Sequence, residues 1–274
     1  MWSTRKFLIW GKTYPEFSKK YLETVCTGAV DEETGKLARI YPLTVRYMEK
    51  PFRTYDWVEV EAEPTGSNDR RPESFRVQQQ SLKVVGHIDT TKKNDWPDRR
   101  RWVLGPKNQN VFASVEELRA AQAKDRTSLG LIRPKAITRV YAKRKPESAR
   151  AEWDEKRAAA LSKSELFIDA ETETRDLEYV PVQYRACFRC DDPACDTEHD
   201  LSILDWGLYV LHLRQFAARG ASMAERDVID HIQNLLDPKQ RDPFLFLGNT
   251  LAHPQNFMIV GLFHPPIERQ GSLF

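Results

Sequence analysis

The sequence predicts an α+β protein: a β-rich, barrel-like sheet in the N-terminal part, then a helical part with a structural zinc site and a closing β-hairpin. Three observations favour this class. Short apolar runs separated by turn residues fill the first hundred positions, as in small barrels and strongly bent sheets. Helix-capping patterns begin only at Ser114. Three of the four cysteines lie within the nine residues from 187 to 195.

The strands of the N-terminal part follow one another closely. Residues 6–10 form an apolar run, and 24–30 and 37–41 flank a polar turn that contains glycine, which predicts a hairpin. Residues 57–63 alternate between apolar and acidic side chains, so one face of that strand is buried. Further strands are expected at the remaining two apolar runs, 74–77 and 82–88. We assign residues 1–112 to this β-rich domain.

The second part, residues 113–274, combines helices with strands of its own. Capping boxes at Ser114 and Ser222 open helices that run to about 124 and 236. Two more helices are expected at 147–163 and 201–218, and strands at 136–142 and 177–186. Residues 244–247 and 257–263 predict a closing hairpin, which can return to the first sheet and pack both parts as one unit.

The composition is that of a soluble globular protein, with 274 residues, 30% charged residues and a net charge of +2. The chain has no apolar run of membrane-spanning length and no secretory signal, so we expect a cytoplasmic protein without membrane contact. It also has no phosphate-binding loop, dinucleotide fingerprint or nucleophile elbow. These absences weigh against three large enzyme classes and leave open whether the protein is an enzyme.

The near-neutral net charge conceals a strong asymmetry. Residues 83–150 carry 17 basic and 7 acidic side chains, a net charge of +10, whereas residues 151–230 carry 9 and 18, a net charge of −9. Such a contrast predicts a nucleic-acid surface in the basic segment. The acidic segment would then face a protein partner. In the alternative interpretation, the two segments neutralise each other inside the fold.

The cysteine cluster predicts a metal site. Residues 187–199 follow the pattern C-x2-C-x4-C-x3-H, which offers Cys187, Cys190, Cys195 and His199 as a closed tetrahedral shell for a structural Zn²⁺. Acidic neighbours would repel phosphate, so we expect this loop to act as a staple or a protein-docking site. Cys26, alone in a β-prone stretch, is expected to be buried and unreactive.

Two short segments interleave basic and aromatic residues, the combination that pairs with phosphates and stacks on bases. The candidate nucleic-acid contacts are Arg99, Arg100, Arg101, Trp102, Arg139, Lys143, Arg144 and Lys145. A solvated basic face is the alternative. Three carboxylates at alternate positions, Asp169, Glu171 and Glu173, are candidate ligands of a metal-dependent nuclease, but an exposed acidic hairpin is the favoured interpretation of this segment.

The hypothesis that best combines these observations is a zinc-stapled nucleic-acid-binding accessory protein of a microbial DNA- or RNA-directed system. A metal-dependent nuclease or other nucleic-acid enzyme is the first alternative. A protein-binding module without nucleic-acid contact is the second.

Overall fold

The computed structural model describes residues 1–18, 22–48, 51–66, 69–90, 96–164 and 177–267, and the structural statements below concern these residues. The predicted α+β class is confirmed. The N-terminal strands are β1 (Ser3–Lys12), β2 (Glu16–Ser18), β3 (Leu22–Asp31), β4 (Leu37–Leu43), β5 (Asp56–Pro64), β6 (Ser74–Val77) and β7 (Lys83–His87). Short 3-10 turns at Val45–Tyr47 and Gln79–Ser81 interrupt them.

Strands β1, β3, β4, β6 and β5 form a closed barrel, because β5 also pairs with β1. Its neighbours are antiparallel except β4 and β6, which run parallel. This Greek-key order is the architecture of the OB-fold, a small five-stranded barrel. The alternation of apolar residues predicted for 57–63 holds in β5, where Val58, Val60 and Ala62 are buried.

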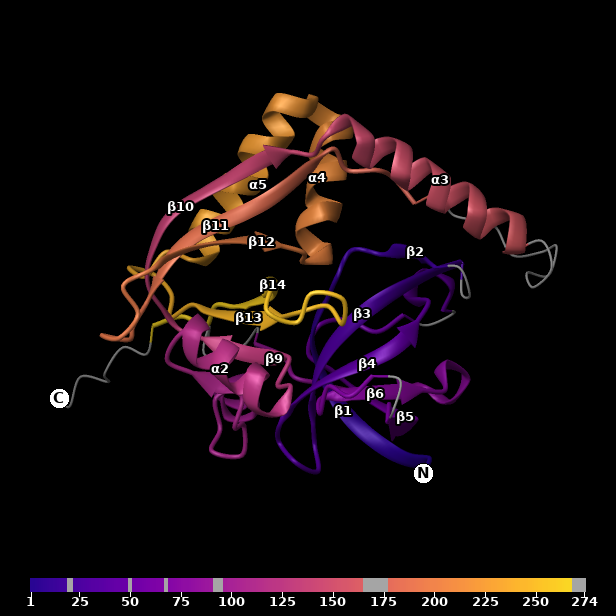
Figure 1. Ribbon diagram of the computed structural model, residues 1–274, viewed down its shortest axis with the longest axis vertical. Helices are drawn as coiled ribbons and strands as arrows, with labels where there is room; N and C mark the ends of the chain where they lie inside the picture. The colour runs from indigo at the N-terminus through magenta and orange to yellow at the C-terminus, as the bar shows by residue number, and fades with distance from the viewer. Residues whose placement is uncertain (19–21, 49–50, 67–68, 91–95, 165–176, 268–274) are drawn as a thin grey trace.

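From residue 97 on, which includes the last residues of the predicted domain 1–112, the chain combines helices and strands (Figure 1). Its helices are α1 (Pro97–Val103), α2 (Val115–Asp125), α3 (Glu147–Ser164), α4 (Trp206–Arg219) and α5 (Ala221–Leu235). Its strands are β8 (Val111–Phe112), β9 (Leu129–Ile132), β10 (Pro134–Arg144), β11 (Val182–Cys190), β12 (Glu198–Ile203), β13 (Phe244–Gly248) and β14 (Met258–Phe263). The predicted closing hairpin is therefore β13–β14.

These strands repeat the order of the first barrel. The described sheet runs β10-β11-β12-β14-β13-β9-β8, and β12 and β14 are its counterpart of the parallel pair β4 and β6. Only Arg133 separates β9 from β10, so one nearly continuous strand joins the two sides of the sheet. Helices α4 and α5 fill the connection between β12 and β13. We infer that the chain contains two barrels of the same OB-like topology, side by side (Figure 1).

Two predicted elements begin five residues later in the structure. The helix expected from residue 201 begins at Trp206, because the Asp205 carboxylate accepts a hydrogen bond from Leu208 N at 3.2 Å and caps the helix there. The residues before it form β12, in which buried His199 alternates with exposed Asp200. The strand expected from 177 begins at Val182.

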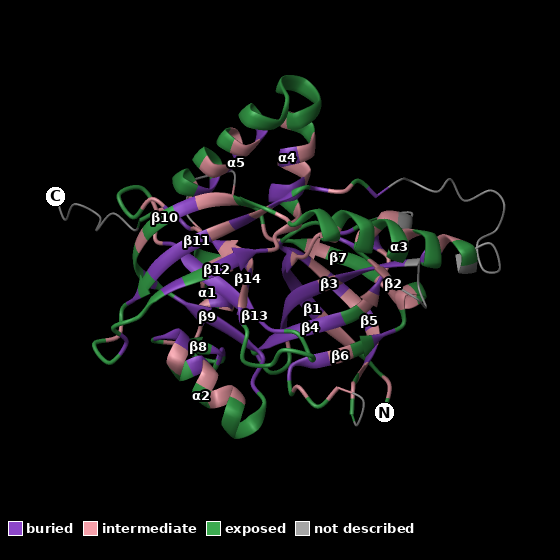
Figure 2. Ribbon diagram, turned by 45° about the horizontal axis from the view of Figure 1, so that its top comes forward, coloured by how far each residue is buried: buried purple, intermediate pink, exposed green. Residues whose placement is uncertain are grey.

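A shared apolar core joins the two barrels, and the strands that build it are largely buried (Figure 2). Trp10 of β1 stacks on Phe246 of β13, with ring centroids 4.0 Å apart and planes 6° apart. The Trp10 indole N–H donates to the Ala29 carbonyl at 2.8 Å. Gly28 has to be glycine, because a Cβ there would collide with the Trp10 ring.

A buried polar network crosses the same interface. The Arg39 guanidinium, on a side chain 5% exposed, donates to Ser74 Oγ at 3.1 Å and Ser128 Oγ at 2.9 Å. It also donates to the carbonyls of Ser128 and Asn249, each at 3.4 Å. Buried Glu73 accepts from Ser128 Oγ and Ser128 N at 2.8 and 3.0 Å. Arg39 and Glu73 therefore balance each other's charge across a shared serine.

Among the described helices, none is both long enough and apolar enough to cross a lipid bilayer.

Replacing Arg39 tests whether this network stabilises the two-barrel arrangement. We expect Arg39→Met to lower the free energy of unfolding by about 3–5 kcal/mol, because Glu73 then stays buried without the cation that balances it. Arg76→Met is the matched control. The Arg76 side chain is 56% exposed and pairs with Glu63 on the surface, so its loss should cost about 1 kcal/mol or less. Denaturant unfolding measures both, and equal effects would contradict the network's role.

Candidate metal centre and nucleic-acid surface

Four side chains converge at the turn between β11 and β12. They are Glu116, Cys190, Cys195 and His199, and their ligand atoms all lie within 4.8 Å of one another. Cys195 Sγ lies 2.8 Å from Glu116 Oε2 and 3.3 Å from His199 Nε2. Glu116 Oε2 lies 3.2 Å from His199 Nε2. Ligands at 2.0–2.3 Å from a tetrahedral zinc ion lie roughly 3.3–3.8 Å apart, so this cluster could hold a metal ion.

Strand pairing and a helix cap position these four groups. Cys190 ends β11 and His199 lies in β12, and both side chains point to the buried inner face of the sheet. Cys195 N donates to the Asp192 carbonyl at 3.0 Å, and the resulting turn brings the Cys195 sulfur back towards Cys190. Glu116 lies in the first turn of α2, whose start is fixed by the cap at Ser114. The cluster therefore connects α2 to the β11–β12 hairpin.

Burial makes charge unfavourable at this cluster. Desolvation raises the pKa of the Cys195 thiol to about 12 and also raises the pKa of Cys190. Desolvation lowers the pKa of the His199 imidazole. A divalent cation would reverse this balance for the thiols, because it stabilises thiolates and displaces their protons. Two sulfurs, one imidazole and one carboxylate are a donor set that zinc accepts.

Cys187, the fourth ligand predicted from the sequence, does not join this cluster. Cys187 and Cys190 lie in the same strand, where side chains three positions apart point to opposite faces. Cys187 instead pairs in register with Arg139 and Asp200 on the outer face. Glu116, more than 70 residues away in the sequence, was not predicted, although the cap that positions it was. Cys26 is half-buried in β3 rather than fully buried.

The predicted contacts at 99–102 lie in α1 and are largely engaged inside the protein. The Arg99 guanidinium lies 3.8 Å from the Tyr55 ring centroid and donates twice to the Ile88 carbonyl. Arg100 pairs with Asp242 at 3.1 Å. Arg101 is exposed and lies 3.4 Å from Asp98, and Trp102 packs edge-on against Trp57.

The second predicted group lies on and just after β10. Arg139, Lys143 and Arg144 are exposed, and Lys145 is half-buried. Arg144 pairs with Glu225 at 3.4 Å, and the Lys145 ammonium lies 5.2 Å from the Tyr179 ring centroid. Within the described part of the chain, neither Arg139 nor Lys143 has an ion-pair partner. The segment at 99–102 is therefore largely occupied by contacts within the protein, whereas the segment on β10 keeps exposed cations.

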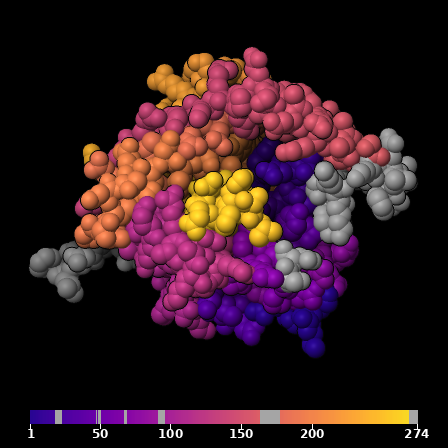
Figure 3. All heavy atoms as spheres, in the orientation of Figure 1, coloured from indigo at the N-terminus to yellow at the C-terminus, as the bar shows by residue number. Residues whose placement is uncertain are grey.

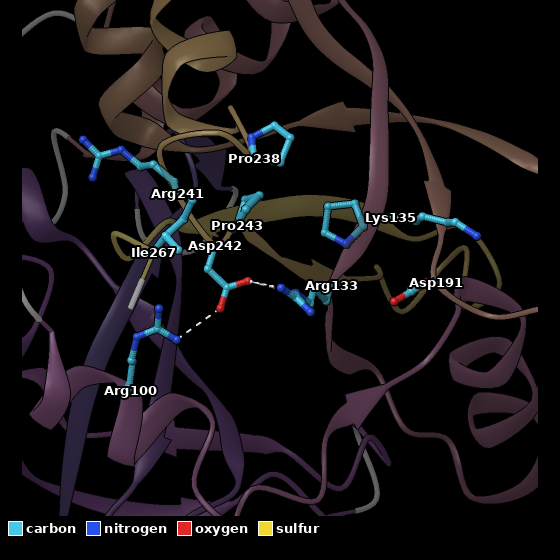
Figure 4. Close-up of a pocket in the computed structure, with 10 residues that line it drawn as sticks. Arg100, Arg133, Lys135, Asp191, Pro238, Arg241, Asp242, Pro243 and Ile267 are labelled. Atoms are coloured by element: carbon cyan, nitrogen blue, oxygen red, sulfur yellow. Dashed lines mark hydrogen bonds and ion pairs between the residues drawn. The ribbon is translucent and has the colours of Figure 1, made fainter. Parts of the chain in front are cut away.

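A pocket of about 480 Å³ lies at the beginning of β10. Figure 4 shows Asp242 between Arg100 and Arg133, with ion-pair distances of 3.1 and 2.8 Å. Lys135 and Arg241 line the same pocket, and Asp191 lies at its edge. Four cations against two carboxylates give this pocket a positive charge beside the exposed strand. Arg133, Lys135 and Arg241 were not among the predicted contacts.

The carboxylates considered for a nuclease, Asp169, Glu171 and Glu173, lie outside the described residues.

Comparison with known proteins assigns a family to the second part of the chain. The family model described as "Domain of unknown function (DUF8757)" matches residues 111–274, more than half of the chain. The chain belongs to this family. A second family model, described as "Domain of unknown function (DUF8758)", matches residues 3–105. No curated protein matches the chain.

Among solved structures, a chain from the "Structure and Conformational Change of a Replication Protein A Heterotrimer Bound to ssDNA" is similar, with a TM-score of 0.32 and 9% sequence identity. The similarity covers 90% of this chain and 43% of that chain. This chain thus spans less than half the length of that one. A TM-score this low supports no argument about fold or function.

Metal analysis of cysteine variants tests the centre. We expect one equivalent of zinc in the wild type and its loss in Cys190→Ser, together with a lower melting temperature, because structural zinc supplies folding free energy. Cys187→Ser is the matched control from the same strand and should keep the metal. Loss of zinc from Cys187→Ser, with retention in Glu116→Gln, would instead support the four ligands expected from the sequence.

Proposed function

We propose that this protein binds single-stranded nucleic acid along β10, on the exposed face of the second barrel. The observation that carries this proposal is the charge of the strand and its surroundings. Residues 127–146 contain six basic side chains and no acidic one. Three of them, Lys135, Arg139 and Lys143, are exposed and have no ion-pair partner among the described residues. Unpaired exposed cations along one strand suit a phosphate backbone.

The neighbouring side chains supply stacking surfaces. Arg139 lies over the Tyr141 ring at 4.0 Å from its centroid. The Tyr141 hydroxyl donates to Asp200 Oδ2 at 2.7 Å, and Arg185 Nε donates to Asp200 Oδ1 at 2.8 Å. One carboxylate thereby fixes an aromatic ring and a guanidinium on the outer face. Planar groups held in this way stack on unpaired bases with little sequence preference.

A groove at the far end of β10 adds aromatic surface. It measures about 270 Å³, lies between α3 and the first barrel, and is lined by two lysines, Lys145 and Lys156, by two carboxylates, Glu16 and Glu152, and by aromatic residues. The aromatic residues are Tyr14, Phe17, Trp153, Tyr179 and Tyr209. Figure 3 shows the surface hollowed beneath α3. A single-stranded nucleic acid that runs along β10 from the pocket at Lys135 would reach this groove at the far end of β10.

The architecture agrees with this placement by analogy. OB-folds that bind oligonucleotides use the face of their second and third strands and the adjoining loops. In the second barrel these strands are β11 and β12, next to β10. In the first barrel they are β3 and β4, whose outer face is covered at Val30, Leu37 and Arg39 by the second barrel. The second barrel therefore offers the open face.

We further infer that Zn²⁺ is the metal of the Glu116, Cys190, Cys195 and His199 cluster. Its role would be to fasten α2 to the β11–β12 hairpin, so that the sheet face beside β10 keeps its shape. The acidic turn next to the cluster, residues 191–197, repels phosphate and is left for contact with a protein partner. Such a division of surfaces is consistent with an accessory subunit of a DNA- or RNA-directed system.

Salt-dependent binding of a short single strand tests the proposal. The plot of log K against log [salt] has a negative slope. We expect the triple variant Lys135→Gln, Arg139→Gln, Lys143→Gln to reduce the magnitude of this slope by about 2, because each phosphate contact on a single strand contributes about 0.7. Its melting temperature should stay that of the wild type, since none of the three has an ion-pair partner among the described residues.

The matched control removes three exposed cations elsewhere: Arg70→Gln, Lys83→Gln, Lys124→Gln. It carries the same change in net charge and should keep the wild-type slope. Equal slopes for both triple variants would contradict a site on β10. Tighter binding of duplex than of single strand would contradict the single-strand assignment.

A further inference from the structure

A second cavity, of about 530 Å³, lies where the two barrels, α1 and α4 meet. Its size is typical of small-molecule sites. Aromatic side chains from three separate segments line it: Trp10 of β1, Tyr55 before β5, and Trp96 before α1. None of these residues belongs to the nucleic-acid site proposed on β10, so the cavity is a separate candidate site.

Tyr55 is the most unusual residue of this cavity. It is 5% exposed and has a φ of 67°, in the left-handed region that bulky residues rarely adopt. Its buried hydroxyl has no hydrogen-bond partner among the described residues. Both features destabilise the folded protein, and such features occur preferentially at functional sites, where a bound ligand can compensate for them. A ligand atom that hydrogen-bonds the Tyr55 hydroxyl would satisfy it.

A second residue that lines the cavity also carries an unpaired polar atom. His264 Nδ1 is buried without a hydrogen-bond partner in the described structure. The imidazole packs edge-on against Trp96, with ring centroids 5.1 Å apart. Burial lowers the pKa of His264 to about 4, so the ring is neutral at pH 7. A neutral imidazole and a phenol offer directional hydrogen bonds to the edge of a polar planar ring.

Two arginines give the cavity positive charge. Arg99 lies over the rings of Tyr55 and Trp96, at 3.8 and 4.8 Å from their centroids, and is held by the Ile88 carbonyl. Arg214 of α4 is exposed at the edge of the cavity and has no ion-pair partner within the described residues. Asp205, which caps α4, is the carboxylate that lines the cavity. Arginine pairs with phosphate oxygens in a bidentate manner.

We propose that this cavity binds a nucleoside monophosphate, with the base among Tyr55, Trp96 and His264 and the phosphate at Arg214. The class follows from the combination of aromatic walls, unsatisfied hydrogen-bonding groups on rings, and an unpaired guanidinium at the opening. A free mononucleotide and the terminal nucleotide of a strand share this chemistry.

Calorimetric titration of the full chain with AMP, CMP, adenosine and ribose 5-phosphate tests the proposal. We expect both monophosphates to bind, and adenosine and ribose 5-phosphate to bind at least about tenfold more weakly, because each lacks one half of the recognised group. Tyr55→Phe should weaken AMP binding about tenfold and leave the melting temperature equal or higher, since it removes an unsatisfied buried hydroxyl. Arg214→Gln should weaken AMP binding by about tenfold or more.

Arg226→Gln, on the exposed surface of α5, is the matched control and should bind AMP as the wild type does. The β10 triple variant should also bind AMP as the wild type does. A failure of the proposed nucleic-acid site on β10 can therefore be distinguished from a failure of the proposed nucleotide site in the cavity. Displacement of AMP by a 5′-phosphorylated oligonucleotide, but not by its 5′-hydroxyl form, would assign the cavity to strand ends. Displacement by neither would assign it to the free mononucleotide. No binding of AMP or CMP at millimolar concentration, or unchanged binding in Tyr55→Phe and Arg214→Gln, would overturn the proposal.

Discussion

The burial of Arg39 between the two barrels is the interaction on which the arrangement of the molecule depends. A guanidinium removed from water needs hydrogen-bond acceptors and a balancing charge, and Arg39 finds them only because Ser128, Asn249 and Glu73 meet at one point. The stack of Trp10 on Phe246 beside it fixes the same interface through apolar contact. Together these contacts cover the outer face of β3 and β4, and direct the exposed sheet surface to β10, β11 and β12.

This arrangement decides how the basic segment is used. Two arginines of α1 lie at the junction of the barrels: Arg100 pairs with Asp242, and Arg99 contacts the Ile88 carbonyl and aromatic rings. Contacts inside the fold therefore account for these two side chains. They do not account for Lys135, Arg139 and Lys143 of β10, which are exposed and have no ion-pair partner among the described residues. The metal cluster lies behind this face, on the inner side of β11 and β12, where it can hold the sheet without meeting a phosphate.

Local patterns predicted local structure well. The alternation in β5, the capping box at Ser114 and the hairpin β13–β14 are each decided by side chains within a few residues. Features that depend on distant contacts were missed. Glu116 reaches the metal cluster only because α2 packs against the β11–β12 turn, and Cys187 leaves it because residues 187–190 form a strand rather than a turn. The cavity at Tyr55 combines residues from both barrels, so its composition could not be read from any one segment.

Cross-linking of a photoreactive single-stranded oligonucleotide, followed by mass spectrometry, tests the central claim most directly, because it locates the strand on the protein. The account predicts cross-links within residues 134–145 of β10 and at its neighbours on β11, and their loss at high salt as phosphate contacts weaken. Cross-links on the first barrel, or on the acidic turn at residues 191–197, would contradict it.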